Sequence, residues 1–348
     1  MTEFGVGLIG YGLAGRVFHA PFIQATDGLD LRAVVSRDPA KVHDSLPGMT
    51  VVPTVEALLA RDDIHLVVIA SPDALHADHA IAALEAGKHV LVDKPFATSL
   101  ADARRVAVTA ERVGRMITIF HNRRWDADFL TLRRLIAQGR LGRIVQFESH
   151  FDRWRPQPSA LWKDARTGGL WLDLGPHLLD QAVCLFGMPD AMTADIATMR
   201  ENAPAPDWFH VTLHYPGRRA ILHASKLAAD HRLRFAVHGT NGSWIKQGLD
   251  TQEPAIVAGG KPDDPELGVD PQPGLYTPAD PAMPAEAVAN ERGDYGAFWH
   301  LLGAALRGEG PNPVPADEAL AVMALLEAGL ESATTRTTIS LNAQPPGT

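Results

Sequence analysis

Near its amino terminus the chain reads Gly10-Tyr11-Gly12-Leu13-Ala14-Gly15, a G-x-G-x-x-G pattern. The pattern follows the apolar run Val6 to Ile9 and opens a helical stretch, which is the context that gives it meaning. The glycines let the backbone turn tightly and approach a pyrophosphate, while the helix start offers free N–H groups and a positive dipole end. The stretch therefore predicts a dinucleotide site, with a ligand-free glycine turn as the alternative.

Further along, short apolar runs alternate with helical patterns. The expected strands after the first are 31–35, 66–70, 90–92 and 116–120. The helices between them have recognisable starts at Asp38-Pro39, Thr54 and Ser99. Strands that alternate with helices imply a parallel sheet covered on both faces. We therefore expect an α/β fold that begins with a doubly wound, dinucleotide-binding domain over residues 1–122.

The pattern changes after about residue 122. The stretches 144–152, 208–215 and 233–237 alternate apolar and polar residues, which is typical of half-buried strands in antiparallel sheets. These stretches predict an α+β domain over residues 123–348, with an open, mostly antiparallel sheet whose second face is fairly polar. Residues 250–290 are rich in Pro, Gly and Asp and predict an irregular excursion, and residues 317–333 predict a helix.

The composition narrows the function classes. The chain has 348 residues, which is enough for two hydrophobic cores. Its net charge is −9, and its sequence has no basic stripe that would bind nucleic acid. Its one cysteine, Cys184, excludes an intrachain disulfide. No apolar run approaches the ~18 residues of a membrane span, and no leader pattern stands at the start. We expect a cytoplasmic protein that acts on a small molecule.

The end of the second strand bears on the choice between NAD and NADP. It reads Ser36-Arg37, with a serine where an acid would bind the ribose 2′-hydroxyl. A serine and a guanidinium suit a 2′-phosphate, so NADP(H) is favoured over NAD(H). Asp38 is interpreted as the cap of the next helix. Ser71-Pro72 and His76 stand at the same sheet edge, and His76 is either a cofactor contact or a surface residue.

The segment Gly168 to Asp180 predicts the catalytic helix. Asp173 and His177 are four residues apart and share a helix face, which Asp180 continues. A carboxylate beside an imidazole fixes its tautomer and raises its basicity, as a general base requires. The alternatives are a surface ion pair or half of a metal site, and the lack of a nearby His or Cys cluster disfavours metal.

A second candidate stands at Asp93-Lys94-Pro95, directly after the fourth strand along the chain. The residue before a proline avoids helical dihedrals, so Lys94 should lie in an extended turn at the carboxyl edge of the sheet. A lysine there can stabilise a developing alkoxide. A solvated surface lysine is the alternative.

Along the chain, the three motifs are the glycine loop, Asp93-Lys94-Pro95 and the segment Gly168 to Asp180. In that order they resemble the Gfo/Idh/MocA family of oxidoreductases over essentially the whole chain. The resemblance implies an N-terminal Rossmann domain followed by a domain with a large open sheet. It also implies that Lys94, Asp173 and His177 are catalytic, with His177 as general base or acid. Asp93 departs from the glutamate of the family's E-K-P motif: the charge is kept, and the reach toward the cofactor is shorter.

Two further stretches, Phe120 to Asp126 and Glu148 to Pro156, look like the NADP-dependent scyllo-inositol dehydrogenase branch. That resemblance implies a cyclic polyol or a sugar as substrate. It also implies cofactor contacts from Arg123 and from Trp162-Lys163, where Lys163 replaces an arginine. Substrate contacts are expected from Arg153 and Tyr295.

The resemblance leaves two other activities open. Some relatives sense a dinucleotide without catalysis, and others use NAD to cleave glycosides. Family members also commonly form homodimers or homotetramers through the open sheet, which its polar second face permits here.

Overall fold

The computed structural model describes residues 3–158 and 168–341, and the chain forms two compact units. The first unit holds Met1–Trp125, Gln252–Leu267 and Asp294–Met323. The second holds Asp126–Thr251, Gly268–Gly293 and Ala324–Thr348. The chain therefore passes between the units several times, and each unit combines segments that are distant in sequence.

The first unit is built on a parallel six-stranded sheet in the order β3-β2-β1-β4-β5-β6. Its strands are β1 Phe4–Ile9, β2 Leu29–Val35, β3 Thr50–Val52, β4 Leu66–Ile69, β5 His89–Val92 and β6 Ile117–Ile119. This strand order is that of the Rossmann fold, so the predicted fold class is confirmed. The short strand β3 lies at the sheet edge and carried no apolar run that would have predicted it.

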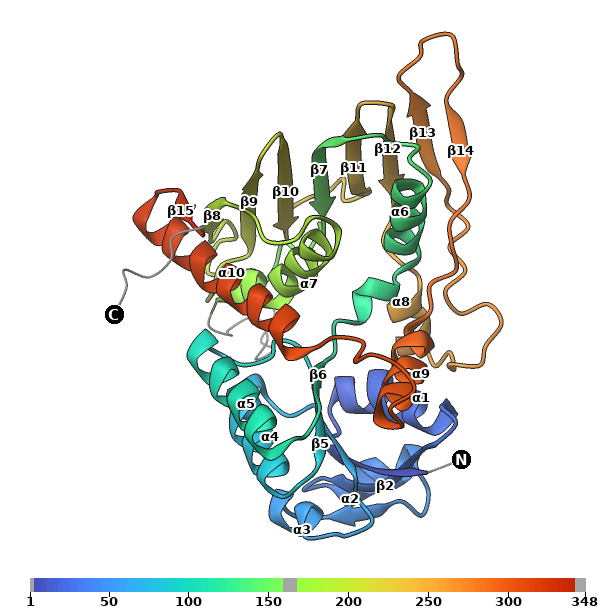
Figure 1. Cartoon of the computed structure of the whole chain (residues 1–348), viewed down its shortest axis with the longest axis vertical. Coiled ribbons are helices and arrows are strands. Elements are labelled where there is room, and N and C mark those ends of the chain that lie inside the picture. Colours follow the sequence, from blue (N-terminus) through green and yellow to red (C-terminus); the bar gives the residue numbers. More distant parts are fainter. Residues whose placement is uncertain (1–2, 159–167, 342–348) are drawn as a thin grey trace. The chain divides into compact units, whose positions relative to one another are not determined.

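Short helices connect these strands. They are α1 Ala20–Ala25, α2 Pro39–Ser45, α3 Val55–Leu59, α4 His76–Glu85 and α5 Leu100–Val113, with α9 Tyr295–Leu306 added from the end of the chain. The side chains of Asp38, Thr54 and Ser99 accept N–H groups of the first turns of α2, α3 and α5, which confirms the three predicted starts. Figure 1 shows α4 and α5 side by side against the sheet.

The second unit is built on a nine-stranded sheet in the order β14-β13-β12-β11-β7-β10-β9-β8-β15. All neighbouring strands are antiparallel except the parallel pair β7 and β10. The central strands are β7 Ile144–His150, β8 Ala191–Ala197, β9 Trp208–Tyr215, β10 Arg218–Ser225, β11 Leu233–Gly239 and β12 Gly242–Gln247. The three predicted strands of this region are present, among others that the pattern did not reveal.

Helices cover one face of this sheet. They are α6 Ala127–Ala137, α7 Gly169–Phe186 and the later part of α10 Ala316–Thr335. Figure 1 shows α7 running along β9 and β10. The aromatic rings of Phe147, Phe235 and Trp244 stack beneath the helices and are fully buried. The opposite face carries the polar residues of the alternating pattern.

The segment 250–290 is more regular than its composition suggests. It contains helix α8 Gln252–Val257 and the strands β13 Gly274–Pro278 and β14 Glu286–Val288, which extend the sheet at its edge. The expectation of a purely irregular excursion is therefore wrong, because pairing with β12 supplies the hydrogen bonds that a Pro-rich stretch cannot make by itself. Across the described parts of the chain, none of the helices has the length and apolar character that crossing a membrane demands.

Candidate active site

The glycine loop has the geometry of a dinucleotide site. Gly10 has a φ of 96°, and a Cβ there would lie 2.6 Å from the carbonyl oxygen of Ala70. A Cβ on Gly15 would lie 2.1 Å from the carbonyl oxygen of Gly10, whereas one on Gly12 would meet nothing within 4 Å. The first glycine thus allows the turn, the third allows close helix packing, and the second leaves its backbone open for a pyrophosphate. The residues present fit a dinucleotide.

The loop lies where the strand order reverses. β1 has β2 on one side and β4 on the other, so the connections from Ile9 and Ile69 leave the sheet in opposite directions. Ligands of open parallel sheets bind outside the carboxyl ends of such strands. Gly10 and Ser71 stand at those two ends, as the sequence predicted for both.

The acidic residue after β2, Asp38, forms the cap of the next helix. The carboxylate of Asp38 accepts the N–H of Lys41 at 3.2 Å and caps α2. The N–H of Asp38 in turn donates to the Ser36 hydroxyl at 3.1 Å, and Arg37 is exposed. The strand end therefore carries the exposed Arg37 guanidinium, beside a Ser36 hydroxyl that bonds the Asp38 main chain and an Asp38 carboxylate that caps α2 through one oxygen.

His76 is a buried residue with two main-chain contacts. Its Nδ1 lies 2.8 Å from the carbonyl oxygen of Pro95, and its Nε2 lies 2.9 Å from that of Ser71. Only 2% of the residue is exposed, so the surface alternative is wrong. The imidazole joins the loops that follow β4 and β5, and a contact with the cofactor remains a prediction.

The loop after β5 carries Asp93 and Lys94, both half-buried. The Lys94 N–H donates to the Asp93 carboxylate at 2.8 Å. The other oxygen of Asp93 lies 3.6 Å from Nε2 of His19. Burial raises the pKa of the Asp93 carboxyl, but the interaction with His19 and nearby positive charge outweigh it and lower that pKa below its usual range.

His19 is a residue to which the sequence analysis gave no role. It is fully buried, and its ring packs 4.7 Å from that of Phe120 and 5.7 Å from that of Trp299, between centroids. The only signal in the sequence is a histidine directly before the Ala20-Pro21 start of α1. The rings of Phe120 and Trp299 pack against the imidazole, whose Nε2 faces Asp93.

Two residues of the first unit that the family resemblance implies as ligand contacts, Arg123 and Tyr295, are buried. Arg123, 7% exposed, forms an ion pair with Glu253 of α8. Tyr295, 1% exposed, begins α9, and its N–H donates to the Gln252 side chain at 2.7 Å. The Tyr295 ring lies 6.5 Å from that of Phe18, between centroids. Their expected roles toward cofactor and substrate remain predictions.

In the second unit, the two glycines before the catalytic segment shape the start of α7. Gly168 and Gly169 have φ values of 79° and 51°, and a Cβ on Gly169 would lie 2.1 Å from the carbonyl oxygen of Pro206. That carbonyl accepts the N–H of Leu170 at 2.8 Å. The helix therefore begins in direct contact with the main chain at Pro206, which only glycine permits.

Helix α7 presents the predicted face. Asp173 is half-buried, whereas His177 and Asp180 are 5% and 2% exposed. The helix is continuous from Gly169 to Phe186, so Asp173 and His177 stand one turn apart on one side. The helix is confirmed, and the catalytic role of the pair remains a prediction.

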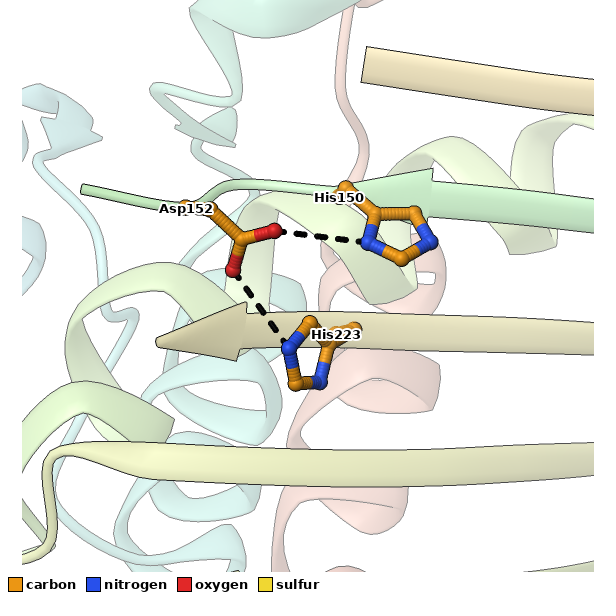
Figure 2. A group of neighbouring side chains, drawn as sticks. All are labelled: His150, Asp152 and His223. Carbon is orange, nitrogen blue, oxygen red and sulfur yellow. Dashed lines mark ion pairs between the residues drawn. The ribbon is translucent and has the colours of Figure 1, made fainter. Parts of the chain in front are cut away.

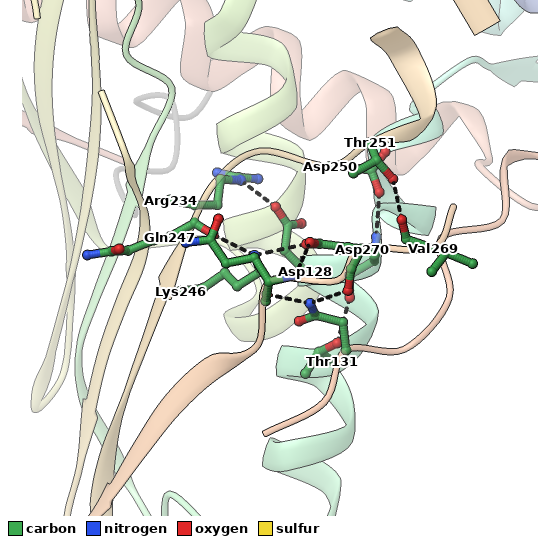
Figure 3. A network of polar contacts seen from close by, with 12 residues as sticks. Asp128, Thr131, Arg234, Lys246, Gln247, Asp250, Thr251, Val269 and Asp270 are labelled. Atoms are coloured by element: carbon green, nitrogen blue, oxygen red, sulfur yellow. Dashed lines mark hydrogen bonds and ion pairs between the residues drawn. The ribbon is translucent and has the colours of Figure 1, made fainter. Parts of the chain in front are cut away.

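A buried polar network around Arg234 holds α7 in place, and Figure 3 shows its ion pair with Asp128. The Arg234 guanidinium on β11 donates to Gln181 of α7 at 2.7 Å and to Ser149 of β7 at 2.7 Å. Its charge is balanced by Asp128 of α6 at 2.9 Å. At the other end of the helix, the Trp171 indole donates to the Leu326 carbonyl at 3.1 Å. Sequence analysis missed Arg234 because its partners come from three other elements.

Three predicted residues remain: Arg153, Trp162 and Lys163. Arg153 is half-buried, and its guanidinium lies 5.0 Å from the centre of the Phe151 ring. Trp162 and Lys163 lie outside the described residues.

Comparison with known proteins places this architecture in a family. Residues 4–121 match the model described as "Oxidoreductase family, NAD-binding Rossmann fold", and residues 133–341 match "Oxidoreductase family, C-terminal alpha/beta domain". The chain is 46% identical to the uncharacterized oxidoreductase YdgJ of Escherichia coli over 97% of this chain and 98% of that protein. It is 35% identical to the scyllo-inositol 2-dehydrogenase (NADP(+)) IolW of Bacillus subtilis, over 97% and 95%.

A solved structure has the same fold over the whole chain. YPO2259 from Yersinia pestis matches with a TM-score of 0.96 and 43% identity, over 99% of both chains. The Rossmann strand order, the glycine loop and these matches together show that the chain is an NAD(P)-dependent oxidoreductase of the Gfo/Idh/MocA family.

Proposed function

We propose that this enzyme moves a hydride between NADP(H) and a secondary alcohol or ketone of a cyclic polyol or a sugar. The observation that carries the proposal is the pairing of a buried imidazole, His177, with a carboxylate one helical turn away, Asp173. The name of IolW, a scyllo-inositol dehydrogenase that uses NADP, supports both the substrate class and the cofactor.

The chain's residues would divide the work of alcohol oxidation. The glycine loop would hold the pyrophosphate of the dinucleotide, and the nicotinamide, when bound, would supply the hydride acceptor. His177 takes the hydroxyl proton, and Asp173 favours the protonated imidazole that results. Lys94 offers an ammonium group to the oxygen on which negative charge develops. Burial of His177 keeps water from competing for the same proton.

The cofactor preference rests on charge at the end of β2. Arg37 is exposed there and offers a guanidinium to a 2′-phosphate, whereas the Asp38 carboxylate bonds the first turn of α2 through one oxygen. Arg37→Ala should weaken NADPH binding about 10- to 100-fold, the worth of a charge-assisted contact, and NADH binding little. Arg104→Ala removes another exposed guanidinium of the first unit and serves as the control. Equal weakening of both cofactors would overturn the preference.

The substrate class is tested with a panel of inositols and aldoses, each with NADP⁺ and NAD⁺, while nicotinamide absorbance is followed. Turnover of an inositol or aldose with a clear NADP⁺ preference supports the proposal. Absence of turnover with intact cofactor binding would point to a dinucleotide-sensing role. Glycoside cleavage without net cofactor consumption would point to a glycosidase.

A further inference from the structure

A cluster of metal-ligand side chains stands on the polar face of the nine-stranded sheet, and it shares no residue with the proposed active site. It consists of His150, Asp152 and His223 (Figure 2). One ligand atom from each residue, two imidazole nitrogens and one carboxylate oxygen, all lie within 4.8 Å of one another. We propose that these three side chains form a binding site for a divalent transition metal, for which Zn²⁺ is the best match.

The sheet register brings the three residues together. β7 and β10 are parallel, and His150 and His223 are partners at their carboxyl ends. The ladder continues past β7, because the N–H of Phe151 donates to the His223 carbonyl and that of Arg153 to the Ser225 carbonyl. Strand alternation therefore persists, and Asp152 points to the same side as His150.

Asp152 divides its two oxygens between the two rings, as Figure 2 shows. Oδ2 lies 3.4 Å from Nδ1 of His150, and Oδ1 lies 3.5 Å from Nε2 of His223. These distances exceed the ~2.9 Å of a good hydrogen bond. They are close to the ~3.4 Å that separates two ligands of a tetrahedral ion with bonds of about 2.1 Å.

Asp152 occupies a buried position, which is unusual for a carboxylate. The residue is 7% exposed, and its buried Oδ1 has no hydrogen-bond partner among the described residues. A buried carboxylate oxygen that lacks a donor is costly. A cation held between Oδ1 and the imidazoles removes that cost.

Glu148 lies behind the His150 ring. Its carboxylate lies 3.2 Å from Nε2 of that imidazole, whereas Nδ1 is the ring nitrogen that faces Asp152. Because Glu148 contacts Nε2, Nδ1 is left as the nitrogen that can ligate a metal beside Asp152. A carboxylate behind a ligating imidazole is the usual second layer of a metal site.

The donor set indicates which metal fits. Two imidazoles and one carboxylate suit Zn²⁺ and its neighbours in the first transition row, and not Ca²⁺ or Mg²⁺, which prefer oxygen donors. Three protein ligands leave a position for water. The rings of Trp208 and His210 stand beside His223, with centroids 5.5 Å away in each case.

The test uses the full-length chain stripped of metal, with Co²⁺ as an optical probe and Zn²⁺ as competitor. We expect one Co²⁺ per chain, with the intense visible bands of low coordination number, displaced by Zn²⁺. Asp152→Asn and His223→Ala should abolish those bands, and Glu148→Gln should weaken affinity about 10- to 100-fold. His214→Ala, which alters a half-buried histidine of β9 outside the cluster, should leave them unchanged.

A second measurement on the unmutated chain covers the case of a variant that fails to fold. Zn²⁺ should shift the imidazole NMR signals of His150 and His223 and leave those of His214 in place. Absence of bands and shifts in the unmutated chain would overturn the proposal. So would bands that persist in folded Asp152→Asn and His223→Ala, because the ion would then lie elsewhere.

Discussion

The guanidinium of Arg234 donates a 2.7 Å hydrogen bond to the side chain of Gln181, and this bond ties strand β11 to the helix that carries Asp173 and His177. Gln181 follows His177 by one helical turn on α7. Both Arg234 and Gln181 are buried, at 1% and 0% exposure, so the bond is shielded from water. The position of the proposed base thus depends on a charge whose counterion, Asp128, lies on a third element.

Arg234→Met should destabilise the second unit. It leaves the Asp128 carboxylate buried without its cation, a change that typically costs about 3–5 kcal/mol. Chemical denaturation gives the unfolding free energy, and hydrogen exchange should show faster opening of α7. Arg232→Met is the matched control, because Arg232 is exposed and pairs with the exposed Asp230; it should stay within about 0.5 kcal/mol. Equal stability of the two variants would contradict the role of the network.

His177→Ala should lower kcat about 10²- to 10⁴-fold while NADPH binding stays intact, because general-base catalysis is worth that much. Turnover is followed by nicotinamide absorbance and binding by NADPH fluorescence. His300→Ala changes an exposed histidine and is expected to have no effect. Near-normal turnover of His177→Ala would refute its role as base.

The lowered pKa of Asp93 makes a pH-dependent prediction. Its folded pKa lies below the ordinary 3.8 of the free carboxyl. The ionised group therefore stabilises the fold above that value, and the stabilisation is lost as pH falls through the folded pKa. His19→Phe removes the largest of the interactions that lower the Asp93 pKa, so that pKa should rise. Carboxyl carbon NMR reports it directly.

Asp102 provides an internal reference in the same spectra. Its pKa is lowered by hydrogen bonds from Ser99 and Arg105, which His19 does not touch. It should therefore titrate identically in both proteins. An unchanged Asp93 titration in His19→Phe would show that another group sets its pKa.

Gly169→Ala should destabilise the start of α7. The new Cβ would lie 2.1 Å from the Pro206 carbonyl oxygen at a φ of 51°, and backbone strain alone costs about 1–3 kcal/mol. Gly187→Ala, at the other end of α7, has a φ of 72° but nothing within 4 Å of the new Cβ. Gly187 has a ψ of −166°, a conformation that only glycine adopts readily, so the matched control is Gly114→Ala at the left-handed end of α5, with a φ of 61° and nothing within 4 Å of the new Cβ. The difference in melting temperature between Gly169→Ala and Gly114→Ala isolates the clash. Similar losses in those two variants would show that the Pro206 contact is unimportant.

Local signals in the sequence predicted much of this protein. The glycine spacing, the helix caps at Asp38, Thr54 and Ser99, and the four-residue interval from Asp173 to His177 depend only on neighbours along the chain. Caps and helical faces are formed by residues within one or two turns, so their chemistry is legible before folding. The strand order and the α7 helix agreed with those signals.

Tertiary structure alone decided the contacts between distant segments. His19 meets Asp93, Arg234 meets Asp128 and Gln181, and His223 joins His150 and Asp152 only because sheet register and helix packing place them together. The strands of 250–290 likewise form because β12 offers a paired edge. Hydrogen bonds across a sheet satisfy backbone groups irrespective of local composition, so no nearby residue announces them in the sequence.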